Sequence, residues 1–125
     1  MYLLDTHTLI WYLTSDAQLS KKALNAITSL SDVYISSVSL WEIAIKKSIN
    51  KLDIDVALAD IVAECNKQDI NILQLELPHY ENVQKLPFFH KDPFDRMIIA
   101  QAQAENLIII TRDEKIPLYN VQTLW

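Results

Sequence analysis

Four carboxylates occupy positions where an ordinary surface charge is not expected. Asp5 ends the apolar stretch YLLD, and Asp113 comes just after the apolar stretch LIIIT. Glu42 and Asp95 lie inside patterns with helical spacing, each beside or in line with apolar residues. Because buried like charges repel one another, four such groups are costly to bring together unless a cation binds them. Oxygen ligands without a histidine or cysteine cluster favour Mg²⁺ or Mn²⁺ over zinc.

Each carboxylate also has a simpler interpretation when it is considered alone. Asp5 can cap a helix that follows it, and Glu42 can pair with Lys46 one turn later. Asp95 at the third position of a helix suits the helix dipole, and Asp113 can begin a turn. Together, the four carboxylates come from separate segments and are predicted to point to one place. The simpler interpretations explain this convergence less well.

The elements that must position these groups alternate between strands and helices. Short apolar runs predict strands, and apolar residues spaced three and four apart predict helices. We expect strands at 2–5, 32–36, 70–75, 107–111 and 121–125, helices at 8–13, 20–30, 37–50, 53–65 and 92–106, and a short helix opened by Pro78. This alternation predicts a three-layer α/β/α sandwich with a central, mainly parallel sheet. Ligands collect beyond the carboxyl ends of such strands, where Asp5 and Asp113 would lie.

Two helix starts carry clear signals. Asp92 is predicted to be the N-cap of a helix with Pro93 at its first position. Asp53 and Asp55 are predicted to lie at the mouth of a helix that runs through Cys65, whose place in an apolar stripe predicts a buried thiol.

Composition narrows the classes of function. A chain of 125 residues, half of them hydrophobic, fits a single domain spanning 1–125. One cysteine provides no disulfide framework, which favours a reducing compartment such as the cytoplasm. The opening segment lacks a basic start, and no run approaches the roughly 18 apolar residues of a membrane span. A net charge of −5 argues against nucleic-acid binding over the whole surface, so an anionic substrate would need local cations or a metal.

Glycine is absent from the chain. This excludes the phosphate-binding loops that depend on glycine, both the dinucleotide fingerprint and the P-loop. Asn50, Asn106 and Asn120 follow predicted helices or turns, at places where glycine would be usual.

Three segments carry a specific resemblance: DTHTLIW at 5–11, SLWEIAIKKSINKL at 39–52 and HKDPFDRMIIAQAQAENLIIITRD at 90–113. In this order and spacing they resemble the PIN domain, in the subgroup of VapC-type toxins of bacterial toxin–antitoxin modules. The similarity extends over nearly the whole chain. The family's acidic quartet falls on Asp5, Glu42, Asp95 and Asp113, and Thr111 matches the hydroxyl residue before the last aspartate.

The resemblance implies a metal-dependent endoribonuclease. Carboxylate-held Mg²⁺ or Mn²⁺ can orient and activate a water and stabilise charge on a phosphate. The resemblance also implies an antitoxin protein as partner, RNA as substrate with 5′-phosphate and 3′-hydroxyl products, and a homodimer. The apolar segment THTLIWYLT at 6–14 is the predicted surface for such association.

Other residues are predicted to surround the site. We predict that six residues contact the substrate or support the carboxylates: Thr111, Arg96, Arg112, His90, Lys46 and Asp92. Lys47, Lys91 and Lys115 also lie near the predicted rim, with solvated surface charge as the alternative for every cation. His7 and His90 are interpreted as polar packing or substrate contacts rather than metal ligands. Trp11 and Trp41 fit core or helix-packing positions, with base stacking as the lesser alternative.

Two other classes of function fit parts of the sequence. The segment DTHT resembles aspartyl-phosphate phosphatases weakly, because His7 stands where their second aspartate would be. A catalytically silent module of the same fold, binding RNA or protein, remains the main alternative. The complete quartet argues against it, since clustered repulsion brings a structural domain no benefit. Magnesium-dependent RNA cleavage distinguishes these hypotheses.

Overall fold

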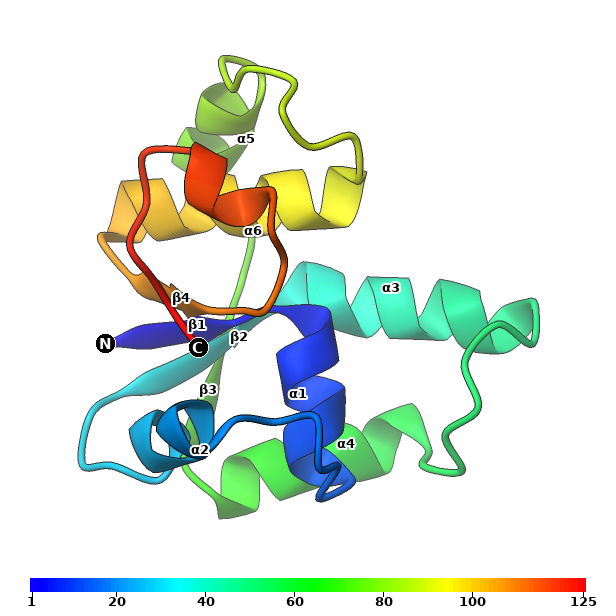
Figure 1. The fold of residues 1–125 in the computed structure, drawn as a ribbon. Helices are drawn as coiled ribbons and strands as arrows, with labels where there is room; N and C mark the ends of the chain where they lie inside the picture. The colour runs from blue at the N-terminus through cyan, green and yellow to red at the C-terminus, as the bar shows by residue number, and fades with distance from the viewer.

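The computed structural model describes residues 1–125 and has five parallel strands in one sheet with helices on both faces (Figure 1). The strands are β1 (Tyr2–Leu4), β2 (Val33–Ser36), β3 (Ile70–Leu73), β4 (Ile108–Ile110) and β5 (Thr123–Leu124). Their order is β3-β2-β1-β4-β5, and every neighbouring pair is parallel. The predicted three-layer α/β/α class is therefore confirmed.

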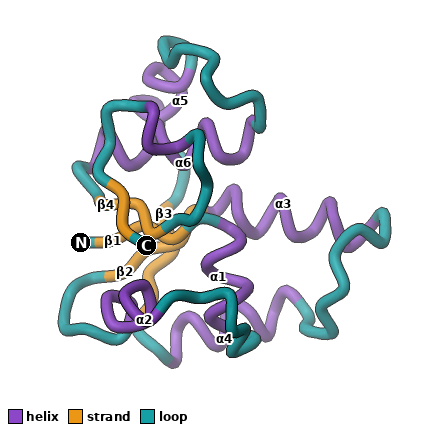
Figure 2. Tube along the Cα trace, viewed as in Figure 1, coloured by secondary structure: helices purple, strands orange, loops and turns teal.

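Helices lie on both faces of the sheet (Figure 2). Two hydrophobic clusters, one on each face, hold them against it. The helices are α1 (Thr6–Leu13), α2 (Lys21–Ile27), α3 (Ser37–Ser48), α4 (Leu58–Lys67), α5 (Leu77–Val83) and α6 (Pro93–Glu105), with a 3-10 turn η1 (Ile116–Leu118). The first cluster joins α1, α2 and α4, and the second joins α6 and η1. Helix α3 contributes to both, through Ile43 and Val38 respectively. Cys65 is fully buried in the first cluster, as predicted.

The order of the strands creates a crevice beside β1. From β1 the chain passes through α1 and α2 on one face to reach β2, whereas it leaves β4 through η1, which packs with α6 on the opposite face (Figure 1). Connections that leave adjacent strands on opposite faces open a crevice at the carboxyl ends of those strands. Asp5 follows β1 and Thr111 follows β4, so both lie at this edge.

Helix α6 begins as its sequence predicts. Asp92 is the N-cap, with Pro93 next, and its Oδ1 accepts hydrogen bonds from the amides of Phe94 (2.8 Å) and Asp95 (3.0 Å). This contact satisfies amides that have no partner within the helix. The geometry fixes where the first turn of α6 starts, and with it the position of Asp95.

The prediction that Asp53 and Asp55 lie at the mouth of a helix is wrong. Helix α4 begins at Leu58, and its N-cap, Ala57, makes no side-chain cap hydrogen bond. Residues 51–57 form neither helix nor strand, and exposed side chains alternate there with half-buried ones. The period of two in KLDIDVA is typical of an extended chain and not of a helix start.

Four residues take left-handed backbone angles although the chain has no glycine. Their φ values are 52° for Ser15, 54° for Asn50, 57° for Asp69 and 54° for Asn106. Asn106 ends α6 in this conformation. The prediction for Asn50 and Asn106 is confirmed, whereas Asn120 does not have a positive φ.

None of the helices combines the length and apolar composition needed to span a lipid bilayer.

Candidate metal centre

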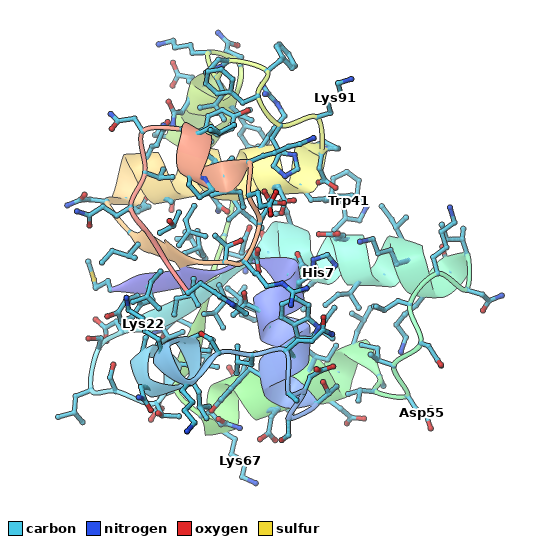
Figure 3. All side chains as sticks on the ribbon, viewed as in Figure 1. His7, Lys22, Trp41, Asp55, Lys67 and Lys91 are labelled. Atoms are coloured by element: carbon cyan, nitrogen blue, oxygen red, sulfur yellow. The ribbon has the colours of Figure 1, made fainter.

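The four predicted carboxylates lie in one neighbourhood at the carboxyl edge of the sheet. Asp5 and Glu42 are buried, and Asp95 and Asp113 are half-buried. The negative charges of Asp5, Glu42 and Asp113 each raise the pKa of Asp95, which requires short distances between these groups. Figure 3 shows side-chain oxygens gathered above His7, between α6 and α3.

Asp5 is both the N-cap of α1 and part of the cluster. Its Oδ1 accepts a hydrogen bond from the amide of Thr8 (2.9 Å), and its Oδ2 accepts one from the hydroxyl of Thr111. Thr111 in turn accepts from the amide of Asp113 (2.9 Å), so one hydroxyl links two of the carboxylate-bearing residues. Burial raises the pKa of Asp5, although the hydrogen bonds from Thr111 and Thr8 oppose that change.

Glu42 is brought into the cluster by α3, which starts directly after β2. Its Oε1 accepts a hydrogen bond from the hydroxyl of Thr6 (2.7 Å), which lies 2.9 Å from the hydroxyl of Ser39. Its Oε2 forms an ion pair with Lys46 at 2.6 Å. The simpler interpretation of Glu42 is thus also correct, and Lys46 is held by this carboxylate rather than projecting freely toward substrate.

Asp95, at the third position of α6, is the least compensated carboxylate of the cluster. Its one side-chain partner is Nε2 of His90, 3.1 Å from Oδ2, and it receives no hydrogen bond from an amide or hydroxyl. Burial, followed by the charges of Asp5, Asp92, Glu42 and Asp113, raises the pKa of Asp95 to about 8. A bound cation would relieve both effects.

Asp113 is anchored by the turn that follows β4. Its Oδ1 accepts hydrogen bonds from the amides of Lys115 (2.7 Å) and Ile116 (3.1 Å), so it also begins a turn. Its Oδ2 is 3.1 Å from Nε2 of His90. Burial alone would raise the pKa of Asp113, but the Lys115 amide, His90 and the Ile116 amide outweigh it, and the pKa is lowered. The Asp113 carboxylate is therefore charged, and both of its oxygens are oriented by these contacts.

His90 joins the last two carboxylates. Potential ligand atoms of His90, Asp95 and Asp113 all lie within 4.8 Å of one another. The interpretation of His90 as a polar packing residue agrees with these contacts. In the sequence, His90 is marked by its position two residues before the N-cap residue Asp92. From this position its ring contacts the first turn of α6, at the amide of Asp92 and the carboxylate of Asp95.

The donor set fits a divalent cation. Several buried or half-buried carboxylates meet, the pKa of Asp95 is raised to about 8, and no lysine or arginine pairs with Asp95, whose one side-chain partner is His90. Oxygen ligands of this kind bind hard cations. Asp95 and Asp113 belong to the trio whose potential ligand atoms lie within 4.8 Å of one another, and Asp5 and Glu42 add two buried carboxylates whose charges act on Asp95.

Arg96 does not lie at the rim of the cluster. It is buried, and its Nη1 donates hydrogen bonds to the carbonyls of Pro87 (2.8 Å) and His90 (3.3 Å). Its guanidinium also lies 4.0 Å from the ring centre of Phe88. A side chain committed in this way supports the loop before α6 and is not available to a phosphate.

The remaining predicted cations divide into anchored and free ones. Lys47 donates through Nζ to the carbonyls of Ile54 (3.4 Å) and Val56 (2.5 Å), which holds the extended segment before α4. Lys91 and Lys115 are exposed.

Arg112 lies beside the carboxylates at an open hollow of about 260 Å³. Its guanidinium is 4.7 Å from the ring centre of Trp11, and Nη2 donates to Oε1 of Gln18 (3.1 Å). The hollow is lined by Asp5, His7, Trp11, Arg112 and Asp113. A larger hollow of about 660 Å³, between the end of α6 and the chain entering β5, has no titratable side chain in its lining.

The two tryptophans differ in their environments. Trp11 is half-buried, stacked on His7 at 5.6 Å and in edge contact with Trp125 at 5.7 Å, so its predicted packing role is confirmed. Trp41 is 61% exposed and is not in the core, but its edge contact with Phe94 of α6 at 5.2 Å agrees with the helix-packing alternative.

Comparisons with known proteins agree with this architecture. A family model described as the PIN domain matches residues 2–122. No curated protein sequence gives a significant match. Among solved structures, VapBC2 from Rickettsia felis, bound to a DNA fragment from its promoter, superposes with a TM-score of 0.73 at 16% identity, covering 98% of this chain and 96% of that one.

Two further solved structures have the same fold. A toxin–antitoxin complex from Klebsiella pneumoniae has a TM-score of 0.67 at 20% identity, and FitAcB from Neisseria gonorrhoeae has 0.67 at 21%. Each comparison covers 100% of this chain and 97% of the other.

Proposed function

The chain belongs to the PIN domain family, and from this membership and the carboxylate cluster we propose that it is a metal-dependent endoribonuclease, the toxin of a toxin–antitoxin module. The observation that carries the proposal is Asp95, a carboxylate placed among like charges without a lysine or arginine partner. We propose a single PIN domain over 1–125 that acts in the cytoplasm, where its RNA substrate is found.

Asp5, Glu42, Asp95 and Asp113 would hold Mg²⁺ or Mn²⁺. A bound ion of this type lowers the pKa of a water and stabilises charge that develops on the phosphate. The protein's own contribution is orientation. Thr111 fixes one oxygen of Asp5, Thr6 fixes one oxygen of Glu42, and turn amides fix one oxygen of Asp113.

Arg112 is the cation best placed to meet the RNA backbone. It lines the hollow next to Asp5 and Asp113, and contacts with Trp11 and Gln18 restrain its guanidinium. A planar guanidinium can bind two phosphate oxygens at once. We propose that Arg112 holds a phosphate of the substrate while the carboxylate cluster acts on the scissile bond.

A protein partner is the second part of the proposal. The similar structures include toxin–antitoxin complexes, and we propose an antitoxin partner for this chain as well. The segment 6–14 does not provide the predicted apolar surface, because Leu9 and Ile10 of α1 are buried in the first cluster. Exposed apolar side chains recur instead on α3, at Trp41 and Ile45, and at its C-cap residue Ile49. We propose this stripe as the contact surface of a homodimer.

RNA cleavage by the purified protein tests the enzymatic proposal. We expect cleavage with Mg²⁺ or Mn²⁺ and none in excess chelator, and we expect Asp5→Asn and Glu42→Gln to abolish it without unfolding the protein. Asp53→Asn, at an exposed position outside the cluster, is the matched control and should cleave normally. Full activity in chelator would exclude the metal mechanism. Magnesium binding without cleavage of any RNA would favour the catalytically silent module.

A further inference from the structure

His90, Asp95 and Asp113 form a trio that resembles a mixed nitrogen and oxygen metal site. Nε2 of His90 lies 3.1 Å from Oδ2 of Asp95 and 3.1 Å from Oδ2 of Asp113. If His90 were a ligand, its imidazole would favour zinc and similar metals over magnesium. The role of His90 therefore bears directly on which ion the proposed centre accepts.

The hydrogen bond on the other side of the ring decides the tautomer. The backbone amide of Asp92 donates to Nδ1 of His90 at 3.2 Å. An amide nitrogen always carries its hydrogen, so Nδ1 must present a lone pair. The ring hydrogen is then on Nε2, the atom that faces both carboxylates. A nitrogen that bears hydrogen has no lone pair to offer a metal.

The backbone of His90 is held equally firmly. Its amide donates to the hydroxyl of Tyr119 (2.8 Å), and its carbonyl accepts from Nη1 of Arg96 (3.3 Å). Tyr119 in turn donates to the carbonyl of Pro87 (2.7 Å). To bind a metal through Nε2, the ring would have to carry its hydrogen on Nδ1, where it would clash with the N–H of Asp92. Otherwise the ring would have to leave this position.

We propose that His90 is a positioning residue: its Nε2–H bridges Asp95 and Asp113 and orients both carboxylates for the ion, while His90 itself does not coordinate it. The two aspartates come from different elements, the first turn of α6 and the turn after β4, and a single donor between them holds them together. Hydrogen bonds to ligating groups typically change metal affinity by about 10–100-fold when removed. The inference rests on the proposed metal centre, but not on the RNA chemistry.

Nitrogen NMR of histidine-labelled protein tests the tautomer directly. The chain has three histidines, and His90→Gln identifies the resonances of His90. We expect its Nε2 to carry hydrogen both without divalent ions and with saturating Mg²⁺. His79 is an internal control, because its Nδ1 also accepts from an amide, that of Glu76 (3.1 Å), while Nε2 contacts Glu105 (2.9 Å). An unprotonated Nε2 of His90 in the Mg²⁺-bound protein would overturn the proposal.

Metal titration by calorimetry provides a second, independent test. We expect His90→Ala to weaken Mg²⁺ and Zn²⁺ binding about equally, by about tenfold. His90→Gln should recover much of the Mg²⁺ affinity, since its amide N–H reaches the place of Nε2–H. A loss in His90→Ala that is far larger for Zn²⁺ than for Mg²⁺ would identify His90 as a ligand. Neither readout needs RNA, so a protein that passes both tests but cleaves no RNA would contradict only the proposed function.

Discussion

Asp92 and Asp95 begin the same helix but use their carboxylates differently. Asp92 accepts two amide hydrogen bonds as the N-cap, whereas Asp95 accepts none from the backbone and faces the other carboxylates. This difference explains why the sequence places an aspartate beside a buried helix. The first stabilises the helix end, and the second is available to an ion.

The raised pKa of Asp95 makes the stability of the metal-free protein depend on pH. Its pKa is about 8 in the folded protein against an ordinary value of 3.8, so between these values the folded state binds more protons than the unfolded state. The free energy of unfolding should therefore fall as pH rises from about 4 to about 8, by at most about 1.4 kcal/mol per pH unit from this group. Urea unfolding in chelator at several pH values measures this slope.

Asp95→Asn should remove that dependence and leave the metal-free protein at least as stable as wild type near neutral pH. It should also lose most of the stabilisation that Mg²⁺ gives wild type, because a ligand stabilises only the state that binds it. Asp92→Ala is the matched control. It should cost about 1 kcal/mol and keep the pH dependence, with its upper pH limit lowered because the charge of Asp92 contributes to the raised pKa of Asp95. An unchanged slope in Asp95→Asn would show that another group titrates.

Arg112 is predicted to act through substrate binding. Arg112→Ala should raise KM for RNA by about tenfold, with a smaller effect on kcat, because a charge-assisted hydrogen bond to phosphate is worth about 1.5–3 kcal/mol. Arg112→Lys should keep part of the affinity. Lys67→Ala is the control, since Lys67 projects from the end of α4 far from His7 (Figure 3). Equal KM values for Arg112→Ala and wild type would exclude this contact.

At the scale of elements, the loop between α5 and α6 depends on one buried side chain. Arg96 donates to the carbonyls of Val83, Leu86, Pro87 and His90. A lysine at this position keeps the charge but cannot reach several carbonyls in different directions. The position of His90, and through it the orientation of Asp95, therefore depends on the guanidinium.

Arg96→Lys should lower the free energy of unfolding by about 2 kcal/mol, because it leaves buried carbonyls without partners. Denaturant unfolding measures the loss, and Arg112→Lys, at an exposed position, is the control with little change expected. A variant that is as stable as wild type but has a raised KM would instead make Arg96 a substrate contact.

At the scale of the whole molecule, the apolar surface lies where the sequence did not indicate it. The side chains of α1 that were predicted to mediate association pack into the core. On α3, Trp41 (61%) and Ile45 (36%) are exposed, and so is the C-cap residue Ile49 (53%). Trp41 and Ile45 are one turn apart on one face of the helix, and Ile49 follows four residues later. Exposed apolar side chains grouped in this way are typical of an interface.

The double variant Trp41→Gln, Ile49→Gln should therefore weaken self-association while changing stability by only about 0.5 kcal/mol. Light scattering across a concentration series measures the oligomeric state, with wild type expected as a dimer. Leu24→Gln, an exposed apolar position on α2, is the control. A wild-type monomer at micromolar concentration, or a dimer that survives the double variant, would contradict the α3 interface.

The sequence by itself determined the order of strands and helices, the start of α6 and the four carboxylates that the structure brings together. These features depend on local periodicity and on cap residues, which operate over a few neighbouring positions. The sequence predicts a helix that begins at Asp53, whereas α4 begins at Leu58. The short alternation in 51–57 competes there with the helix signals that follow it. The left-handed angles at Ser15 and Asp69 carried no comparable signal.

Only the tertiary structure decided which partner each side chain takes. Arg96 has the sequence position of a rim cation, but loop carbonyls surround it in the structure, and His90 contacts Asp113, 23 residues away. The hydrogen bond between Thr111 and Asp5 spans 106 residues of chain. Contacts of this kind depend on how the sheet brings distant strand ends together, and no local pattern in the chain specifies them.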